Sequence, residues 1–315
     1  MPDQPPTEAG APSEAGAPTE AGAPTSDTDV DPATPYLPAA RIVSLPGRGE
    51  TFVRVGEQRP GRPTVLLLHG WLASADLNWF ALYEPLAAGW NVIALDHRGH
   101  GRGLRTNRPF ALEAAADDAA AVLDTLGDEL AAEPLIACGY SMGGPIALFL
   151  ARRRPDLVHG LVLAATALEW NRRRTDRLLW RTLGAIGVAL RLGGDTKVAN
   201  RIIDDMAAGD DLVARYRSQL LAEAKRLNST DAIGAGRALS RFDGQRTAEA
   251  LRLPAAVVAT RRDRLVRPHR QVALAEALGA VRFDLEADHD VFIRQPRLWA
   301  DSIIEALGSV AARLR

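Results

Sequence analysis

The fold of this chain follows from the stretch Leu135–Leu148, which reads LIACGYSMGGPIAL. Its apolar beginning predicts a buried strand, and its Ala- and Leu-rich end predicts a helix that Pro155 terminates. Between them, Gly139, Ser141 and Gly143 form the pattern Gly-x-Ser-x-Gly, which in this setting places a serine on a sharp strand-to-helix turn. We expect a strained backbone at the serine and a close approach of strand and helix at both glycines. On the pattern alone, a glycine-rich turn with an incidental serine is the alternative.

Length and composition narrow the class of protein. The 315 residues are enough for one large α/β domain with an insertion. The formal net charge is −1, so the composition does not indicate a nucleic-acid partner. Neither a basic leader with an apolar core nor a continuous apolar window of about 18 residues is visible, so we expect a soluble, cytoplasmic protein without a signal peptide or transmembrane helix. Cys138 is the only cysteine, and we expect it to be a small core residue.

The chain divides into four predicted segments. Residues 1–36 repeat the unit Glu-Ala-Gly-Ala-Pro-Ser/Thr and lack large apolar side chains, so we expect a disordered tail. Residues 37–166 and 244–315 alternate buried-strand and helix patterns, which predicts an α/β fold with a doubly wound, mostly parallel sheet. Residues 167–243 lack a clear strand and carry Arg, Leu and Ala at helical spacing. We interpret them as a helical cap inserted after the sixth strand.

The predicted elements of the two core segments follow from apolar periodicity. Strands are expected at 41–44, 51–55, 64–68, 91–95, 135–138, 161–165, 255–259 and 281–285, and helices at 78–88, 112–126, 269–278 and 297–314. We expect Asp117, Asp118 and Asp124 on the water-exposed side of the second helix. Ligands of doubly wound sheets bind at the carboxyl ends of the strands, which is where Ser141 would lie.

Several motifs in a fixed order resemble the α/β-hydrolase fold family over roughly residues 40–315. His69-Gly70-Trp71 is similar to the family's His-Gly-x after the third strand, and Asp96–Gly101 (DHRGHG) is similar to its Asp-x-Arg-Gly-x-Gly. The stretch Gly139–Gly144 resembles the nucleophile elbow, and the order Ser141, Asp263, His289 is the family's own. Two departures are Gly103, where the family usually has serine, and Asp288, where a small residue is common.

The resemblance assigns catalytic roles to three side chains. A serine hydroxyl needs a base, and His289 follows the last strand beside the elbow, so we expect Ser141 as nucleophile and His289 as base. His269 is the nearest rival base. Asp263 fits the carboxylate that orients the histidine, although it is also suited to capping the next helix. The rival acids, Glu169 and the weaker candidate Asp243, border the predicted cap. His97, His100 and His159 are expected in packing or surface positions.

The same resemblance implies an oxyanion hole and indicates a pocket. The expected donors are the backbone N–H groups of Trp71 and Met142, supported by His69, Gly70 and the elbow glycines Gly139 and Gly143. We expect Trp71, Tyr140 and Trp170 to contribute to substrate binding, with packing as the alternative for Trp71. The segment Trp170–Arg191 carries six arginines, which indicate peripheral contact with an anionic membrane or, alternatively, a solvated helix face.

These observations predict a serine hydrolase that cleaves carboxylic esters through an acyl-enzyme intermediate. The expected substrate is a small-molecule ester or lipid with a medium to long acyl chain. Thioesterases, carbon–carbon bond hydrolases and haloperoxidase-like enzymes share this triad and remain alternatives. A ligand-binding protein that keeps the fold with little turnover is the alternative of another class. Nothing in the sequence indicates a metal, an organic cofactor or a nucleic-acid partner.

Overall fold

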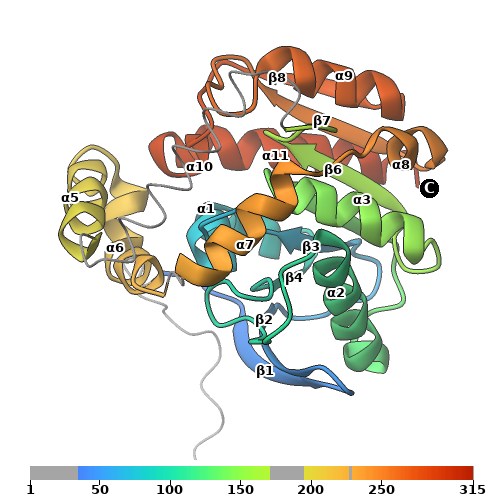
Figure 1. Ribbon diagram of the computed structural model, residues 1–315, viewed down its shortest axis with the longest axis horizontal. Coiled ribbons are helices and arrows are strands. Elements are labelled where there is room, and N and C mark those ends of the chain that lie inside the picture. Colours follow the sequence, from blue (N-terminus) through green and yellow to red (C-terminus); the bar gives the residue numbers. More distant parts are fainter. Residues whose placement is uncertain (1–34, 171–194, 227–228, 315) are drawn as a thin grey trace, which may run out of the picture. The chain divides into compact units, whose positions relative to one another are not determined.

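A single eight-stranded sheet organises the chain in a computed structural model that describes residues 35–170, 195–226 and 229–314 (Figure 1). All described elements belong to the unit Pro35–Arg315, and the predicted tail lies outside the described residues except for residues 35 and 36. The strands lie in the order β1-β2-β4-β3-β5-β6-β7-β8. They span Ala39–Leu45 (β1), Gly49–Val55 (β2), Thr64–Leu68 (β3), Asn91–Leu95 (β4), Leu135–Tyr140 (β5), Gly160–Ala164 (β6), Ala255–Thr260 (β7) and Val281–Leu285 (β8).

The sheet is antiparallel only at its beginning. β1 pairs with β2 and β2 pairs with β4 in antiparallel fashion, whereas every pairing from β4 and β3 through to β8 is parallel. This arrangement confirms the predicted fold class. The parallel strands β3 to β6 are buried along their whole length, because helices cover both faces of the sheet. That burial explains why their sequences are continuous apolar runs.

Helices on the two faces enclose two separate cores. One face carries α2 (Leu112–Leu126), α3 (Gly143–Arg153), α8 (Gln245–Ala250) and α9 (Pro268–Leu278). The other face carries α1 (Ala75–Ala87), α10 (Val291–Arg294) and α11 (Pro296–Ala311). The short 3₁₀ helix η1 (Gly127–Glu129) follows α2. Helix α1 begins three residues before its predicted start because the Ser74 hydroxyl caps it, accepting the Leu77 N–H at 3.2 Å.

The described part of the predicted insertion, residues 167–243, consists mainly of helices. It contains α5 (Asp195–Ala207), α6 (Asp211–Ala224) and α7 (Ser229–Ser240). Residues 171–194, which include most of the arginine-rich stretch, lie outside the described residues. The two ends of the segment meet in an antiparallel bridge between Glu169 and Asp243, and the Gly244 N–H donates to the Leu168 carbonyl at 2.8 Å. The insertion therefore leaves and re-enters the sheet at one place.

A buried ionic cluster ties α6 of this insertion to the core. The Arg102 guanidinium contacts the carboxylates of Asp76 at 2.8 Å, Asp96 at 3.3 Å and Glu223 of α6 at 3.3 Å. Asp76 also forms a two-pronged ion pair with Arg54, at 2.9 and 2.6 Å. Burial raises the pKa of Glu223, which shares this cluster with two other carboxylates. The cluster therefore joins β2, α1 and α6 to the loop after β4, and the charge of each member stabilises that of its neighbours.

The prediction for Asp118 was wrong. Only 2% of this residue is exposed, and its carboxylate accepts two hydrogen bonds from Arg98, at 2.6 and 2.7 Å, and one from Arg48. Asp118 follows the inward-facing Ala115 by three residues and precedes the inward-facing Val122 by four, so helical geometry places it on the core side. There it anchors the loop of the Asp-x-Arg-Gly motif. Asp117 is half-buried and Asp124 is exposed.

The glycine that departs from the family pattern fits its loop. A Cβ at Gly103 would lie 2.2 Å from the carbonyl oxygen of His97 and 2.5 Å from that of Asp96. Because backbone atoms cannot move aside cheaply, serine does not fit at this position. The adjacent Arg102 instead holds the loop through the ionic cluster described above.

Candidate active site

The turn after β5 has the geometry that its sequence predicts. Ser141 has a φ of 52°, which is strained for a residue with a side chain. A Cβ at Gly139 would lie 2.4 Å from the Gly143 carbonyl oxygen, and one at Gly143 would lie 2.0 Å from that of Leu68. The Ser141 N–H donates to the Ala164 carbonyl at 2.9 Å, which ties the turn to β6. The serine hydroxyl therefore stands above the carboxyl end of the sheet.

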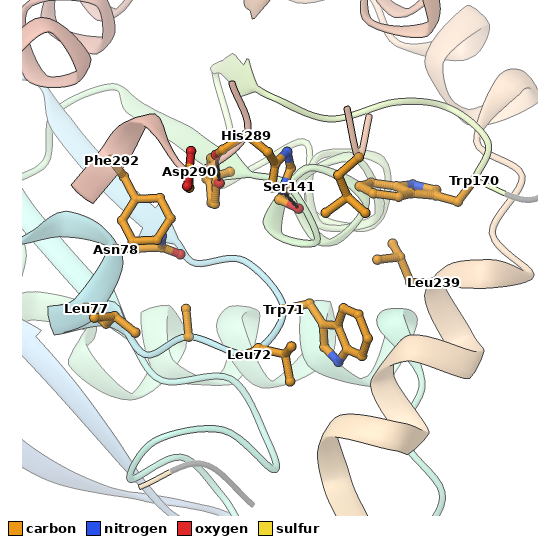
Figure 2. A pocket seen from close by; sticks show the side chains of 13 residues that line it. Trp71, Leu72, Leu77, Asn78, Ser141, Trp170, Leu239, His289, Asp290 and Phe292 are labelled. Atoms are coloured by element: carbon orange, nitrogen blue, oxygen red, sulfur yellow. Dashed lines mark hydrogen bonds between the residues drawn. The ribbon is translucent and has the colours of Figure 1, made fainter. Parts of the chain in front are cut away.

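Three side chains from three separate loops meet at this turn, and Figure 2 shows two of them, Ser141 and His289. His289 Nε2 lies 3.0 Å from Ser141 Oγ, and His289 Nδ1 lies 2.8 Å from Asp263 Oδ2. Parallel pairing of β7 with β8 brings the Asp263 and His289 loops side by side. The structure thus brings together the serine, histidine and aspartate that the sequence nominated.

The Asp263 carboxylate is fixed by its own loop. Its Oδ1 accepts the N–H groups of Leu265 at 2.8 Å and Val266 at 2.7 Å. Its Oδ2 accepts the Thr260 hydroxyl at 2.8 Å and lies 3.2 Å from Gln271 Nε2. The side chain is fully buried, so these donors take the place of water. They also fix the orientation of the carboxylate toward His289 Nδ1.

The loop that carries His289 is held from two sides. Asp288 Oδ1 accepts the N–H of His289 at 2.7 Å and that of Arg264 at 3.1 Å, and so joins the histidine loop to the aspartate loop. The Tyr140 hydroxyl donates a short hydrogen bond to the His289 carbonyl. Burial raises the pKa of the Tyr140 phenol well above its usual value, which keeps this donor protonated. Asp288 and Tyr140 together therefore fix the position of the histidine loop.

The loop His69-Gly70-Trp71 rests on a cluster of neutral histidines. His69 Nε2 accepts the His97 N–H at 2.9 Å, so Nδ1 carries the proton and donates to the Gly70 carbonyl at 2.8 Å. The ring of His69 lies 4.3 Å from that of His97 and 5.5 Å from that of His100. Burial lowers the pKa of His69 to about 4 and of His100 to about 3, and it lowers that of His97 as well.

A largely apolar cavity of about 250 Å³ opens beside the serine. Figure 2 shows Trp71, Trp170 and Leu239 on one side of Ser141 and Leu77, Asn78 and Phe292 on the other. All three predicted substrate-binding residues, Trp71, Tyr140 and Trp170, line it. Met142 directly precedes α3, so its N–H lies at a helix N-terminus, where N–H groups lack intrahelical acceptors.

The rival residues lie elsewhere. His269 is exposed at the start of α9. Glu169 and Asp243 form the bridge at the base of the insertion, and the Asp243 carboxylate accepts the Gln245 N–H at 3.1 Å. His159 is exposed before β6. Within the described ranges, no group of three or more His, Cys, Asp or Glu side chains is arranged to hold a metal ion. In the same ranges, every helix is too short or too polar to cross a bilayer.

Some residues of the site were not predicted from the sequence. Gln271, buried in α9, accepts the Thr260 N–H at 2.9 Å and faces Asp263. Asn78, buried in α1, accepts the Gly70 N–H at 2.7 Å and lines the cavity. The only sequence signal for either is an amide inside an otherwise apolar helix face, which is a weak signal.

Comparison with known proteins agrees with this architecture. A family model described as the alpha/beta hydrolase fold matches residues 63–296, so the chain belongs to the α/β-hydrolase fold family. A pimeloyl-[acyl-carrier protein] methyl ester esterase of Neisseria meningitidis is 43% identical over 102 residues, which are 32% of this chain and 36% of the relative. The chain thus aligns with little more than a third of that esterase.

Two further proteins match over most of their length. A Rhizobium rhizogenes protein with the provisional name carbamate hydrolase RutD is 28% identical over 257 residues, 80% of this chain and 95% of the relative. The crystal structure of an enol-lactonase from Burkholderia xenovorans LB400 superposes with a TM-score of 0.65 at 22% identity, covering 85% of this chain and all of that one. At this identity the structural match establishes the fold alone.

Proposed function

We propose that the protein is a serine hydrolase that cleaves carboxylic esters through a covalent acyl-enzyme intermediate. The family match and the hydrolase names of its relatives support hydrolase activity. The observation that carries the proposal is the continuous chain of contacts from Ser141 Oγ through the His289 ring to Asp263, at 3.0 and 2.8 Å, beside an apolar cavity. Neutral His289 Nε2 takes the serine proton, and Asp263 holds the Nδ1–H tautomer that this transfer requires.

The reaction would run in two half-reactions. In the first, Ser141 Oγ attacks the ester carbonyl carbon, a tetrahedral oxyanion forms, and His289 returns its proton to the departing alcohol oxygen. In the second, His289 removes a proton from water, the hydroxyl attacks the acyl carbon, and the serine oxygen leaves with the proton. We assign stabilisation of the oxyanion to the backbone N–H groups of Trp71 and Met142, with His69 and Gly70 supporting the first of these loops.

The cavity favours a medium-length acyl chain over a long one. Its volume of about 250 Å³ lies below the range of about 300–1,000 Å³ typical of pockets for drug-sized ligands. The lining side chains are mostly apolar or aromatic, and the polar ones among them include Ser141, His289, Asn78 and Asp290. The proposed partner is accordingly a small-molecule or lipid-like ester. Membrane contact through the arginine-rich stretch stays a prediction, since that stretch lies mostly outside the described residues.

Hydrolysis of a chain-length series of p-nitrophenyl esters tests the proposal. We expect burst kinetics in the wild type, a rate maximum at medium chain length, and a fall in kcat of about four orders of magnitude or more in Ser141→Ala and His289→Ala. Ser44→Ala, at an exposed position of β1, is the matched control and should retain activity. Hydrolysis that persists in Ser141→Ala, or a folded wild type that cleaves none of the esters, would refute the proposal. Cleavage of the matched thioesters alone would move the substrate class to thioesters.

A further inference from the structure

A glycine inside helix α7 lies against the indole of Trp71. Gly236 is buried, and its φ lies outside the left-handed region, so the backbone does not require glycine there. Glycine also weakens a helix relative to alanine, because it has more backbone freedom to lose on folding. A Cβ at this position would lie 2.8 Å from Trp71 Cζ2 and 3.3 Å from both Cε2 and Cη2. The missing side chain therefore leaves the space that the indole occupies.

The same indole forms part of the wall of the catalytic cavity. Trp71 lines this cavity together with Ser141. Leu239, which follows Gly236 on α7 by three residues and so shares its face of the helix, lines the cavity as well. Figure 2 shows Trp71, Trp170 and Leu239 on the same side of the serine. Helix α7 therefore bounds this side of the cavity directly through Leu239 and indirectly through the position of the indole.

Helix α7 is held more firmly than the indole. A Cβ at Gly99 would lie 2.6 Å from Asp231 Cβ, so the first turn of α7 is in tight contact with the loop after β4. Ala235 and Leu239 of the same helix are almost fully buried. The Trp71 side chain, in contrast, is only half-buried, and the open space beside it is the cavity. A side chain at position 236 would therefore move the indole into the cavity and leave the helix in place.

We propose that Gly236 is a specificity-determining residue that sets how long an apolar ester chain the cavity accepts beside Trp71. This inference rests on the proposed ester hydrolysis and deepens it. Gly236 acts through the indole: it leaves room for the ring to lie against α7, and the space that the ring vacates in the cavity holds methylene groups of the substrate. The chain that lies there is the acyl chain or the alkoxy chain of the ester, which share this apolar chemistry.

Two series of esters test the proposal in wild type and Gly236→Ala. In the first, the acyl chain of p-nitrophenyl esters grows from acetyl to decanoyl. In the second, the alcohol chain of acetate esters grows from ethyl to octyl. The measured quantity is kcat/KM for the longest esters that wild type hydrolyses, relative to the shortest ester of the series. We expect Gly236→Ala to lower this ratio by about tenfold in one series, and that series identifies the chain that lies beside Trp71.

Two further variants separate the contact with the indole from the change in the helix. Gly234→Ala, on the same helix, is the matched control, because a Cβ there would meet Phe110 Cβ at an ordinary contact distance of 3.4 Å. It gains the same helix propensity and should keep the wild-type chain-length profile. Trp71→Leu removes the indole and keeps the backbone N–H assigned to the oxyanion. Adding Gly236→Ala to Trp71→Leu should change the ratio by less than about twofold, because the colliding ring is absent.

The outcomes distinguish this proposal from the proposed function. An unchanged profile in Gly236→Ala, or an equal change with and without the indole, overturns the role of Gly236. If Gly236→Ala does not fold, the double variant with Trp71→Leu should fold, and its failure would overturn the role as well. Dissociation constants of the same esters for Ser141→Ala, with and without Gly236→Ala, are measured by calorimetry and require no turnover. A binding preference that shifts with Gly236, without hydrolysis by the wild type, overturns only the esterase.

Discussion

Replacing His100 with asparagine should remove a large part of the protein's sensitivity to acid. The His100 ring is buried, and its Nδ1 lies 3.1 Å from the Arg98 carbonyl, to which it donates. Asparagine places an amide N–H near the same position and does not titrate. Among the described residues, His100 Nε2 has no hydrogen-bond partner, so the substitution removes no contact there.

The expected size follows from the pKa of His100. Burial lowers the pKa of His100 from 6.5 to about 3. Between these two pH values, His100 is protonated in the unfolded chain and neutral in the folded protein. The folded state is therefore fully favoured above pH 6.5, and it loses stability as the pH falls through 6.5 toward the folded value of about 3. Each pH unit in this window costs about 1.4 kcal/mol, so the step from pH 6.5 to about pH 4.5 costs roughly 3 kcal/mol.

Chemical denaturation at about pH 7.5 and about pH 4.5 measures this difference. Wild type should lose roughly 3 kcal/mol more of its free energy of unfolding between the two pH values than His100→Asn does. His269→Asn, at an exposed position, controls for the loss of a histidine as such. An equal loss in wild type and His100→Asn would refute the reasoning, because it would mean that the buried ring takes up its proton without unfolding.

Three further substitutions probe separate parts of the structure. Tyr140→Phe should lower kcat for aryl esters by about tenfold with little change in KM, since it frees the histidine loop; a change in KM alone would indicate substrate contact instead. Arg102→Leu should lower the free energy of unfolding by about 3 kcal/mol in denaturant titrations, because Asp96 loses its cation while Asp76 and Glu223 keep only Arg54 and Arg226, and an unchanged midpoint would contradict this. Gly143→Ala should abolish folding as judged by circular dichroism, since its Cβ would lie 2.0 Å from a carbonyl oxygen, whereas Gly308→Ala has open space and should fold normally.

The sequence was most informative where local rules determine structure. The parallel strands were readable as apolar runs because both of their faces are buried. The turn at Ser141 was readable because only glycine fits at Gly139 and Gly143, and such constraints leave a mark on the sequence. The ends of elements were less accurate, as at Ser74, whose capping role was overlooked.

Contacts between residues far apart in the sequence could not be predicted from local sequence patterns. Asp118 was predicted to be exposed because a charged residue on a helix is usually solvated. In the structure, Arg98 and Arg48 from other loops pair with it. Gln271 and Asn78 acquire their roles from loops that fold onto them, and neither belongs to a motif. The helices of the insertion were expected from periodicity, but their attachment through Arg102 depends on tertiary structure.

Covalent labelling with a fluorophosphonate probe, followed by peptide mass spectrometry, asks whether Ser141 is an activated nucleophile. We expect one labelled site, at Ser141, in wild type and in the Ser44→Ala control, and no labelling in Ser141→Ala or His289→Ala. Labelling that depends on both residues would show that the 3.0 Å contact between them activates the serine. A folded wild type that stays unlabelled, or that is labelled at another residue, would contradict the acyl-enzyme mechanism.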